Sequence, residues 1–134
     1  MSTKLAGNEW AEFVHHEGNR VLEMRWLPSP MNDAAFQASI ALFVWHAETV
    51  RPHGLLVDAT NFHHRPGSGM MQWRDESILP RYGAAGVRRF AFQMPSGTPN
   101  TMESGGKEAV DGPAVFPTAF FSERKNALAW LAKS

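Results

Sequence analysis

The chain has 134 residues, a length that suits one domain with one hydrophobic core. Apolar residues make up 43% and charged residues 19%, which is typical of a globular protein. Thirteen basic residues balance thirteen acidic ones, which argues against a dedicated nucleic-acid binder, because such a protein needs a basic excess on one face. The chain has no cysteine, which excludes disulfides, zinc–thiolate clusters and thiol nucleophiles.

Neither a signal peptide nor a membrane span is evident in the sequence. The N-terminal residues contain no apolar stretch of signal-peptide length, and no run approaches the length of a transmembrane helix. We therefore expect a cytoplasmic protein. We expect residues 1–8 to be disordered and residues 9–134 to form a single domain.

Two alternating segments open the predicted domain. Residues 10–16 and 20–27 have the period of half-buried strands, and residues 17–19 favour a tight turn between them. In the second strand the side chains alternate between two faces, with Leu22, Met24 and Trp26 on one and Glu23 and Arg25 on the other. This pattern predicts an antiparallel hairpin.

A helix is predicted next, ending near Arg51, because the residue before Pro52 avoids helical backbone angles. Asn32 or Ser29 is suited to cap its start. Its apolar residues recur at helical spacing, at Phe36, Ile40, Phe43, Val44 and Ala47.

The second half alternates between strands and helices. Residues 54–60 form a short apolar run that predicts a strand buried on both faces. A helix follows from about Met70, and Pro80 must either kink it or begin a second segment. Residues 87–94 alternate again and predict another strand.

The C-terminal part contains a long irregular segment. Residues 95–118 are rich in glycine and proline and predict a flexible loop. Residues 119–121 favour a short strand, and Ser122 can cap a last helix. In that helix three residues are expected to face inward: Ala127, Trp130 and Leu131. The order β-β-α-β-α-β-(β)-α predicts an α/β protein with a mixed sheet.

Three strings add a family resemblance to this order. The segments GLLVDATNF, ILPRYGAAGVRRFAF and AFFSERKNALAWL make the chain similar to the STAS/SpoIIAA-like family of anti-sigma-factor antagonists, and to its bacterial branch related to lipid-binding folds. The resemblance implies a single-domain STAS-like sandwich. The family's antagonists carry a phosphorylatable serine before a glycine, and Ser68-Gly69 occupies that place; here Pro66 and Gly67 replace the Asp and Ser that precede it.

The segment Asp58–Met70 has the highest density of polar and ionisable side chains in the chain. Ser68 has four interpretations: a helix cap, a ligand contact, a phosphorylation site, or a catalytic serine with His63 or His64 as its base. The backbone N–H groups around Gly67 and Gly69 could receive an anionic group at the start of a helix.

The acid and the histidines of this segment have similar alternatives. Asp58 ends a central strand, where open α/β sheets bind ligands, but it could equally close an Asx-turn with Thr60 or Asn61. With His63 and His64 it would hold a metal only if the loop folds back, and we expect neither a metal nor a cofactor.

Apolar side chains supply a second kind of candidate. Trp45, Trp73, Met70 and Met71 could pack on the core, or line an apolar pocket or a dimer face. Residues within 95–118 could cover such a pocket.

Because no coherent catalytic set is apparent, we expect a non-enzymatic cytoplasmic module that binds an apolar or amphipathic small molecule or a protein partner, with a homodimer as one option and nucleic acid excluded. A phosphorylation switch at Ser68 and a serine hydrolase are the alternatives. The candidate contact residues are Asp58, His63, His64, Ser68, Gly69, Met70 and Trp73.

Overall fold

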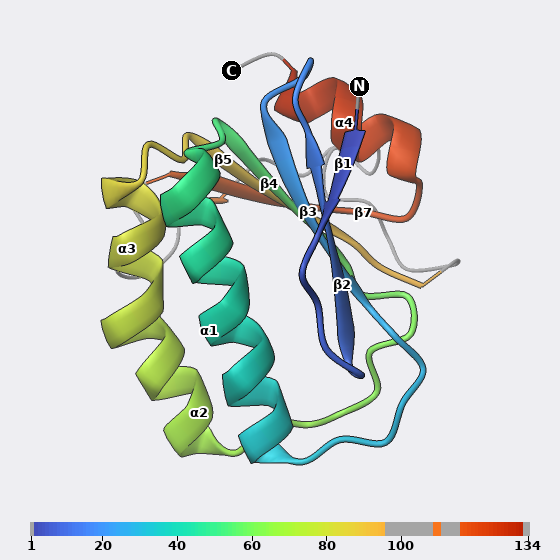
Figure 1. Ribbon diagram of the computed structural model, residues 1–134, viewed down its shortest axis with the longest axis vertical. Helices are drawn as coiled ribbons and strands as arrows, with labels where there is room; N and C mark the ends of the chain where they lie inside the picture. Colours follow the sequence, from blue (N-terminus) through green and yellow to red (C-terminus); the bar gives the residue numbers. More distant parts are fainter. Residues whose placement is uncertain (1, 96–108, 111–115, 133–134) are drawn as a thin grey trace.

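A computed structural model describes residues 2–95, 109–110 and 116–132, and its centre is a mixed β-sheet (Figure 1). The strands lie in the order β1-β2-β3-β4-β5-β7-β6, with β3, β4, β5 and β7 parallel to one another and the remaining pairings antiparallel. Their bounds are Ser2–Leu5 for β1, Ala11–His16 for β2, Val21–Trp26 for β3, Gly54–Asp58 for β4, Arg89–Gln93 for β5, Ala109–Val110 for β6 and Pro117–Phe121 for β7.

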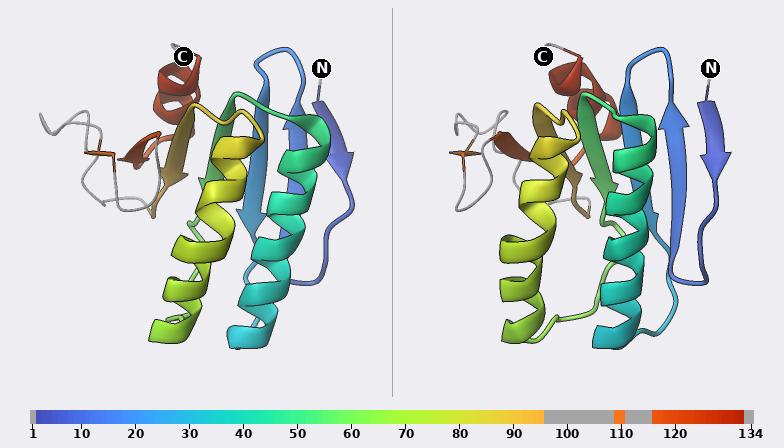
Figure 2. Two further views of the ribbon diagram at one scale, coloured as in Figure 1. Left: turned by 90° about the vertical axis from the view of Figure 1, so that its left-hand side faces the viewer. Right: turned by 60° about the vertical axis from the view of Figure 1, so that its left-hand side comes forward.

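Helices cover both faces of this sheet (Figure 2). On one face, α1 (Asp33–Val50) lies beside a second helical segment made of α2 (Ser68–Trp73), the π-helix η1 (Arg74–Ile78) and α3 (Leu79–Ala84). On the other face lies α4 (Arg124–Leu131), which packs on β4, β5 and β7. Two separate apolar clusters result, one on each face of the sheet.

The central strand β4 explains why the sheet is covered on both sides. Its first four residues, Gly54 to Val57, are all buried. Leu55 and Val57 join the cluster beneath α1, whereas Leu56 joins the cluster beneath α4. A continuous apolar run is what such a strand requires, so the predicted two-faced burial is confirmed.

Helix α1 begins and ends as its sequence predicts. The Asn32 side chain caps it by accepting a hydrogen bond from the Ala35 N–H at 2.9 Å. Arg51, which precedes Pro52, leaves the helix in a left-handed conformation with φ of 51°. The predicted inward face is buried, from Phe36 through Ala47.

The second helical segment accommodates Pro80 by a wider turn before it. Proline has no N–H to donate to the carbonyl of Glu76, so the ordinary ladder cannot continue through this point. Instead, the Leu79 N–H bonds to the carbonyl of Arg74, five residues earlier, which widens the turn into η1. Helix α3 then starts with Pro80 in its first turn.

Residues 2–8, for which the sequence predicts disorder, are among the residues that the structure describes. Ser2–Leu5 forms the edge strand β1, which pairs with β2 in register Ser2 to His16. Two side chains hold the connection that follows, because His46 Nε2 of α1 lies 2.7 Å from the Ala6 carbonyl oxygen and the Asn8 carboxamide accepts the N–H groups of Trp10 and Ala11.

Two further observations complete the comparison with the predicted fold. Within the predicted loop 95–118, residues 96–108 and 111–115 lie outside the described part of the chain, whereas β6 and the start of β7 fall inside the loop's bounds. The described helices include none that is both long and apolar enough to cross a bilayer.

Candidate functional site

An apolar cavity of about 340 Å³ lies between the sheet and the second helical segment. Its walls come from α1, the β4–α2 connection, the α2–η1–α3 segment, and the adjacent strands β3, β4, β5 and β7 with their flanks. Its lining residues are Trp26, Phe36, Ile40, Phe43, Val57, Ala59, Phe62, Pro66, Met71, Arg74, Asp75, Leu79, Tyr82, Phe90, Phe92, Met94, Phe116, Thr118 and Phe120. The size and apolar walls are those of a small-molecule site.

Strand alternation builds the aromatic wall of the cavity. Phe90 and Phe92 are two residues apart in β5, so both project to the α1 face, with ring centroids 4.6 Å apart and planes within 9°. Phe120 of the neighbouring β7 stacks on Phe92 at 5.1 Å, and Phe116 lies 6.2 Å from Phe90. The exposed edge of Phe120, at 37%, leaves this wall partly open to solvent.

The widened turn η1 brings charged residues to the same cavity. Arg74 and Asp75 both line it, and the Nε and Nη2 atoms of Arg74 donate to Asp75 Oδ1 at 3.2 and 2.9 Å. The two charges therefore offset each other at the cavity wall. Single π-turns inserted into helices occur frequently at functional sites.

Tyr82 of α3 adds a buried polar group. Only 2% of this residue is exposed and it lines the cavity; its hydroxyl has no hydrogen bond to a described residue and is not fully enclosed. Burial raises the pKa of the Tyr82 hydroxyl, and the nearby charges of Arg74 and Arg81 only partly oppose this rise. The hydroxyl is therefore protonated and able to donate.

Asp58 is one of the predicted contact residues, and it closes a turn. Its Oδ1 atom accepts hydrogen bonds from the N–H and hydroxyl of Thr60, at 3.1 and 2.7 Å. The Asx-turn alternative is thus confirmed. Its other oxygen lies 3.7 Å from Arg25 Nε, on the α4 side of the sheet and away from the cavity.

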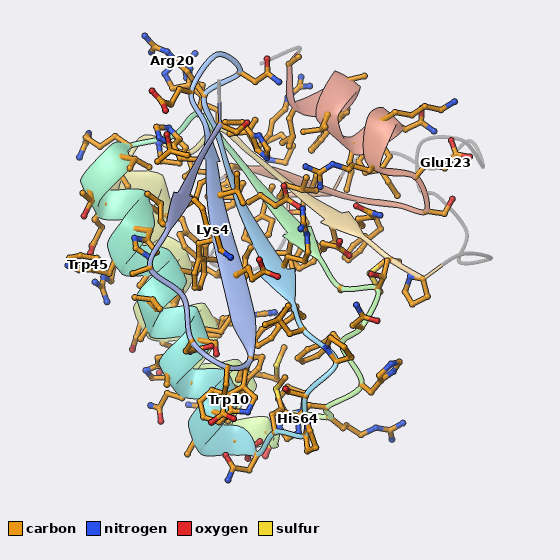
Figure 3. The ribbon with its side chains drawn as sticks, turned by 45° about the vertical axis from the view of Figure 1, so that its right-hand side comes forward. Lys4, Trp10, Arg20, Trp45, His64 and Glu123 are labelled. Carbon is orange, nitrogen blue, oxygen red and sulfur yellow. The ribbon has the colours of Figure 1, made fainter. Side chains whose placement is uncertain are left out.

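The two adjacent histidines have different roles in the structure. His63 is exposed, whereas His64 lies 2.8 Å from Asp33 Oδ1, near the start of α1 (Figure 3). The same oxygen accepts the N–H of Gly67 at 3.3 Å, so Asp33 ties the β4–α2 connection to α1. Across the described residues, no group of three or more His, Asp and Glu side chains is placed to hold a metal ion.

The interpretation of Ser68 as a helix cap is wrong. Gly67 occupies the cap position and Ser68 is the first helical residue, so its hydroxyl lies one position too late to reach the open N–H groups. Ser68 and Gly69 are both exposed. Ser68 makes no hydrogen bond with a histidine in the described part of the chain.

The predicted apolar candidates divide into three groups. Met71 lines the cavity. Met70 and Trp73 are half-buried and pack against the core without lining the cavity. Trp45 points away from the sheet on the outer side of α1 and is 56% exposed (Figure 3).

The opposite face of the sheet holds a buried charge. Glu23 of β3 is fully buried beneath α4, where both of its oxygens accept hydrogen bonds from Arg124, and His16 Nε2 lies 2.8 Å away. Burial alone would raise the pKa of Glu23, but the hydrogen bonds from Arg124 and His16 and the charges of Arg124 and Arg25 outweigh it and lower the pKa to about 2.

Sequence reasoning missed four of these residues: Glu23, Arg74, Asp75 and Tyr82. The sequence carries no signal for the burial of Glu23, because alternation with Leu22 and Met24 places it on the face that the pattern predicts to be solvated. Arg74 and Asp75 carry none either, because charged residues six and five positions before a helical proline are usually on a solvated face.

Comparison with protein-family models, curated proteins and solved structures finds no match for this chain. The fold and the cavity define its class: a mixed α/β protein with an apolar pocket between the sheet and its helices.

Proposed function

We propose that this protein is a non-enzymatic binding module that holds an apolar or amphipathic small molecule in the cavity beneath α1 and η1. The observation that carries the proposal is the cavity itself: about 340 Å³, walled by aromatic and aliphatic side chains, with a few polar residues among them. Such walls favour a ligand because burying apolar surface contributes about 25 cal/mol per Å².

The position of the cavity in the sheet supports the same function. Ala59 and Met94 follow the carboxyl ends of the parallel strands β4 and β5, and both line the cavity. Open α/β sheets bind their ligands in crevices at this edge. The predicted resemblance to STAS-like proteins is part of the proposal, and what supports it is the run of elements from β2 to α4.

Thermal unfolding with candidate ligands tests the proposal. The panel contains decanoate, decanol, lysophosphatidylcholine and 2-isopropenylnaphthalene, which differ in head group and share an apolar body. A ligand at about one hundred times its Kd stabilises the folded chain by about 2.7 kcal/mol, which raises Tm by several degrees. We expect at least one member to do so.

Two neighbouring substitutions show whether such a ligand is in the cavity. Met71→Trp adds a bulky ring to the cavity wall and should abolish the shift. Met70→Trp is the matched control, because Met70 is also half-buried in α2 but does not line the cavity. The proposal fails if no panel member stabilises the wild-type chain, or if both variants respond as the wild type does.

A phosphorylation switch at Ser68 is a second candidate function, because the Ser68 side chain is exposed at the first position of α2. Its hydroxyl is accessible to a kinase. Incubation with bacterial lysate and ATP, followed by intact-mass measurement, should add one phosphoryl group to the wild-type chain and none to Ser68→Ala. An unchanged mass for the wild type rejects this function.

A further inference from the structure

We infer that the Tyr82 hydroxyl is the polar anchor of the cavity and that the ligand is a flat aromatic molecule bearing one neutral hydrogen-bond acceptor, such as a carbonyl. The inference rests on the proposed function and specifies the chemistry of its ligand.

The first step is the unused hydrogen-bonding capacity of Tyr82. Among the described residues, the fully enclosed side-chain atoms without a hydrogen-bond partner comprise Gln93 Oε1 and not the Tyr82 hydroxyl, so this hydroxyl borders accessible space that a ligand can reach. Tyr82 is 2% exposed and lines the cavity, yet none of the described residues bonds to its hydroxyl. A ligand acceptor in the cavity would supply the missing partner.

The second step is that the ring of Tyr82 is held in place. It packs edge-on against Phe43 and Phe90, with centroids 5.7 Å away in both cases and interplanar angles of 63° and 74°. The hydroxyl therefore occupies a fixed position, and a donor that is already oriented loses little entropy when it bonds to a ligand.

The third step concerns the charge of the ligand. A buried carboxylate needs a cation that is free to pair with it. Arg74 is the cation among the described residues that line the cavity, but two of its nitrogens are already bonded to Asp75. With these charges offset, a neutral acceptor is favoured over an anion.

The fourth step concerns shape. The rings of Phe90, Phe92 and Phe120 are stacked with interplanar angles of 9° and 17°, which makes one wall of the cavity flat. A planar aromatic body can stack against such a wall, and aromatic pairs contribute beyond their buried area.

Three matched probes and one substitution test the inference by calorimetry. 2-Acetylnaphthalene carries a carbonyl, 2-isopropenylnaphthalene has nearly the same shape without an acceptor, and 2-naphthoate carries a charge. We expect the acetyl compound to bind the wild-type chain most tightly. Tyr82→Phe should weaken its binding about five- to tenfold, the effect of one hydrogen bond, and should change binding of the isopropenyl compound less than about twofold.

A readout without ligand accompanies these measurements. Tyr82→Phe removes only an unpartnered hydroxyl, so the variant should fold and unfold at a temperature no lower than the wild type. A clear loss of Tm would show that the hydroxyl already has a structural partner and would overturn the inference.

The other outcomes separate this inference from the proposed function. If both neutral probes bind equally and Tyr82→Phe affects neither, the anchor is rejected while the apolar site stands. If 2-naphthoate binds most tightly, the neutral acceptor is rejected. If Met71→Trp leaves all binding unchanged, or nothing binds, the proposed function fails and the inference fails with it.

Discussion

Glu23 in β3 and Arg124 in α4 are about one hundred residues apart in the sequence, and their side chains form a two-pronged ion pair inside the protein. Glu23 is fully buried, and Arg124 is the first residue of the helix that covers it. This pair, together with a contact between Arg124 and His16 of β2, connects the C-terminal helix to the N-terminal strands of the sheet.

Replacement of Arg124 by alanine should destabilise the fold, because it removes the main partner of a buried carboxylate. Breaking a fully buried pair costs about 3–5 kcal/mol, and we expect less here, because Arg124 is 34% exposed and His16 and Arg25 remain close to Glu23. Urea unfolding measures the loss.

Arg81→Ala is the matched control for that measurement. Arg81 also forms a two-pronged pair, with Glu48, but both side chains are exposed, and solvent screening leaves such pairs little effect on stability. Equal losses for the two variants would contradict the importance of the Glu23–Arg124 pair.

The stability of the protein should depend on pH through Glu23. Its pKa is about 2 when folded and near 4.5 when unfolded, so the unfolded chain takes up this proton first as the pH falls. The contribution of Glu23 is complete above about pH 4.5 and declines as the pH falls toward 2.

Unfolding free energies measured from pH 7 to pH 2.5 should therefore fall less steeply for Glu23→Gln than for the wild type. Glu9→Gln is the control, because Glu9 is exposed and forms no ion pair in the described part of the chain. Parallel pH profiles for the wild type and Glu23→Gln would count against this assignment.

Two glycines should respond oppositely to alanine. At Gly69 an added Cβ meets nothing within 4 Å, and the residue lies in α2, so alanine should stabilise the fold by about 0.5–1 kcal/mol. An added Cβ at Gly86 also meets nothing within 4 Å, but its φ of +101° is strained for alanine. Gly86→Ala should therefore lower the free energy of unfolding by about 1–2 kcal/mol. If the urea midpoints of both variants shift in the same direction relative to the wild type, the predicted difference is refuted.

The Asn32 cap of α1 should make a measurable contribution to stability. Asn32→Ala removes the acceptor of the Ala35 N–H and should cost about 1 kcal/mol. Asn61→Ala serves for comparison, because Asn61 is exposed and its side chain bonds to no described residue. We expect a lower Tm for Asn32→Ala only. If the Tm of Asn32→Ala equals that of the wild type, the Asn32 cap does not stabilise α1.

Features that depend on local pattern could be predicted from the sequence. The apolar run at β4, the helical spacing of Phe36 and Phe43, and the inward face of Trp130 each depend on neighbours in the chain, and each is confirmed. The helix stop before Pro52 has the same local origin.

Features that depend on segments distant in the sequence could not be predicted from it. The alternation of β3 predicted a solvated side for Glu23, because nothing near it in the sequence shows that α4 returns to cover that side. The cavity likewise combines Arg74 and Tyr82 with rings from β5 and β7. Ser68 was misassigned by one position, which is within the usual uncertainty of helix ends.

The alternation along β3 determines how strongly the fold disfavours a pairing of β3 that is shifted by one residue. Met24 and Trp26 pack beneath α1, while Glu23 lies beneath α4. A slip of β3 by one residue would exchange the two sets, placing a carboxylate among aromatic rings and leaving Arg124 opposite an apolar side chain. The buried charge thus fixes the pairing register, so sequences that replace it with an apolar residue would be free to pair the hairpin in more than one way.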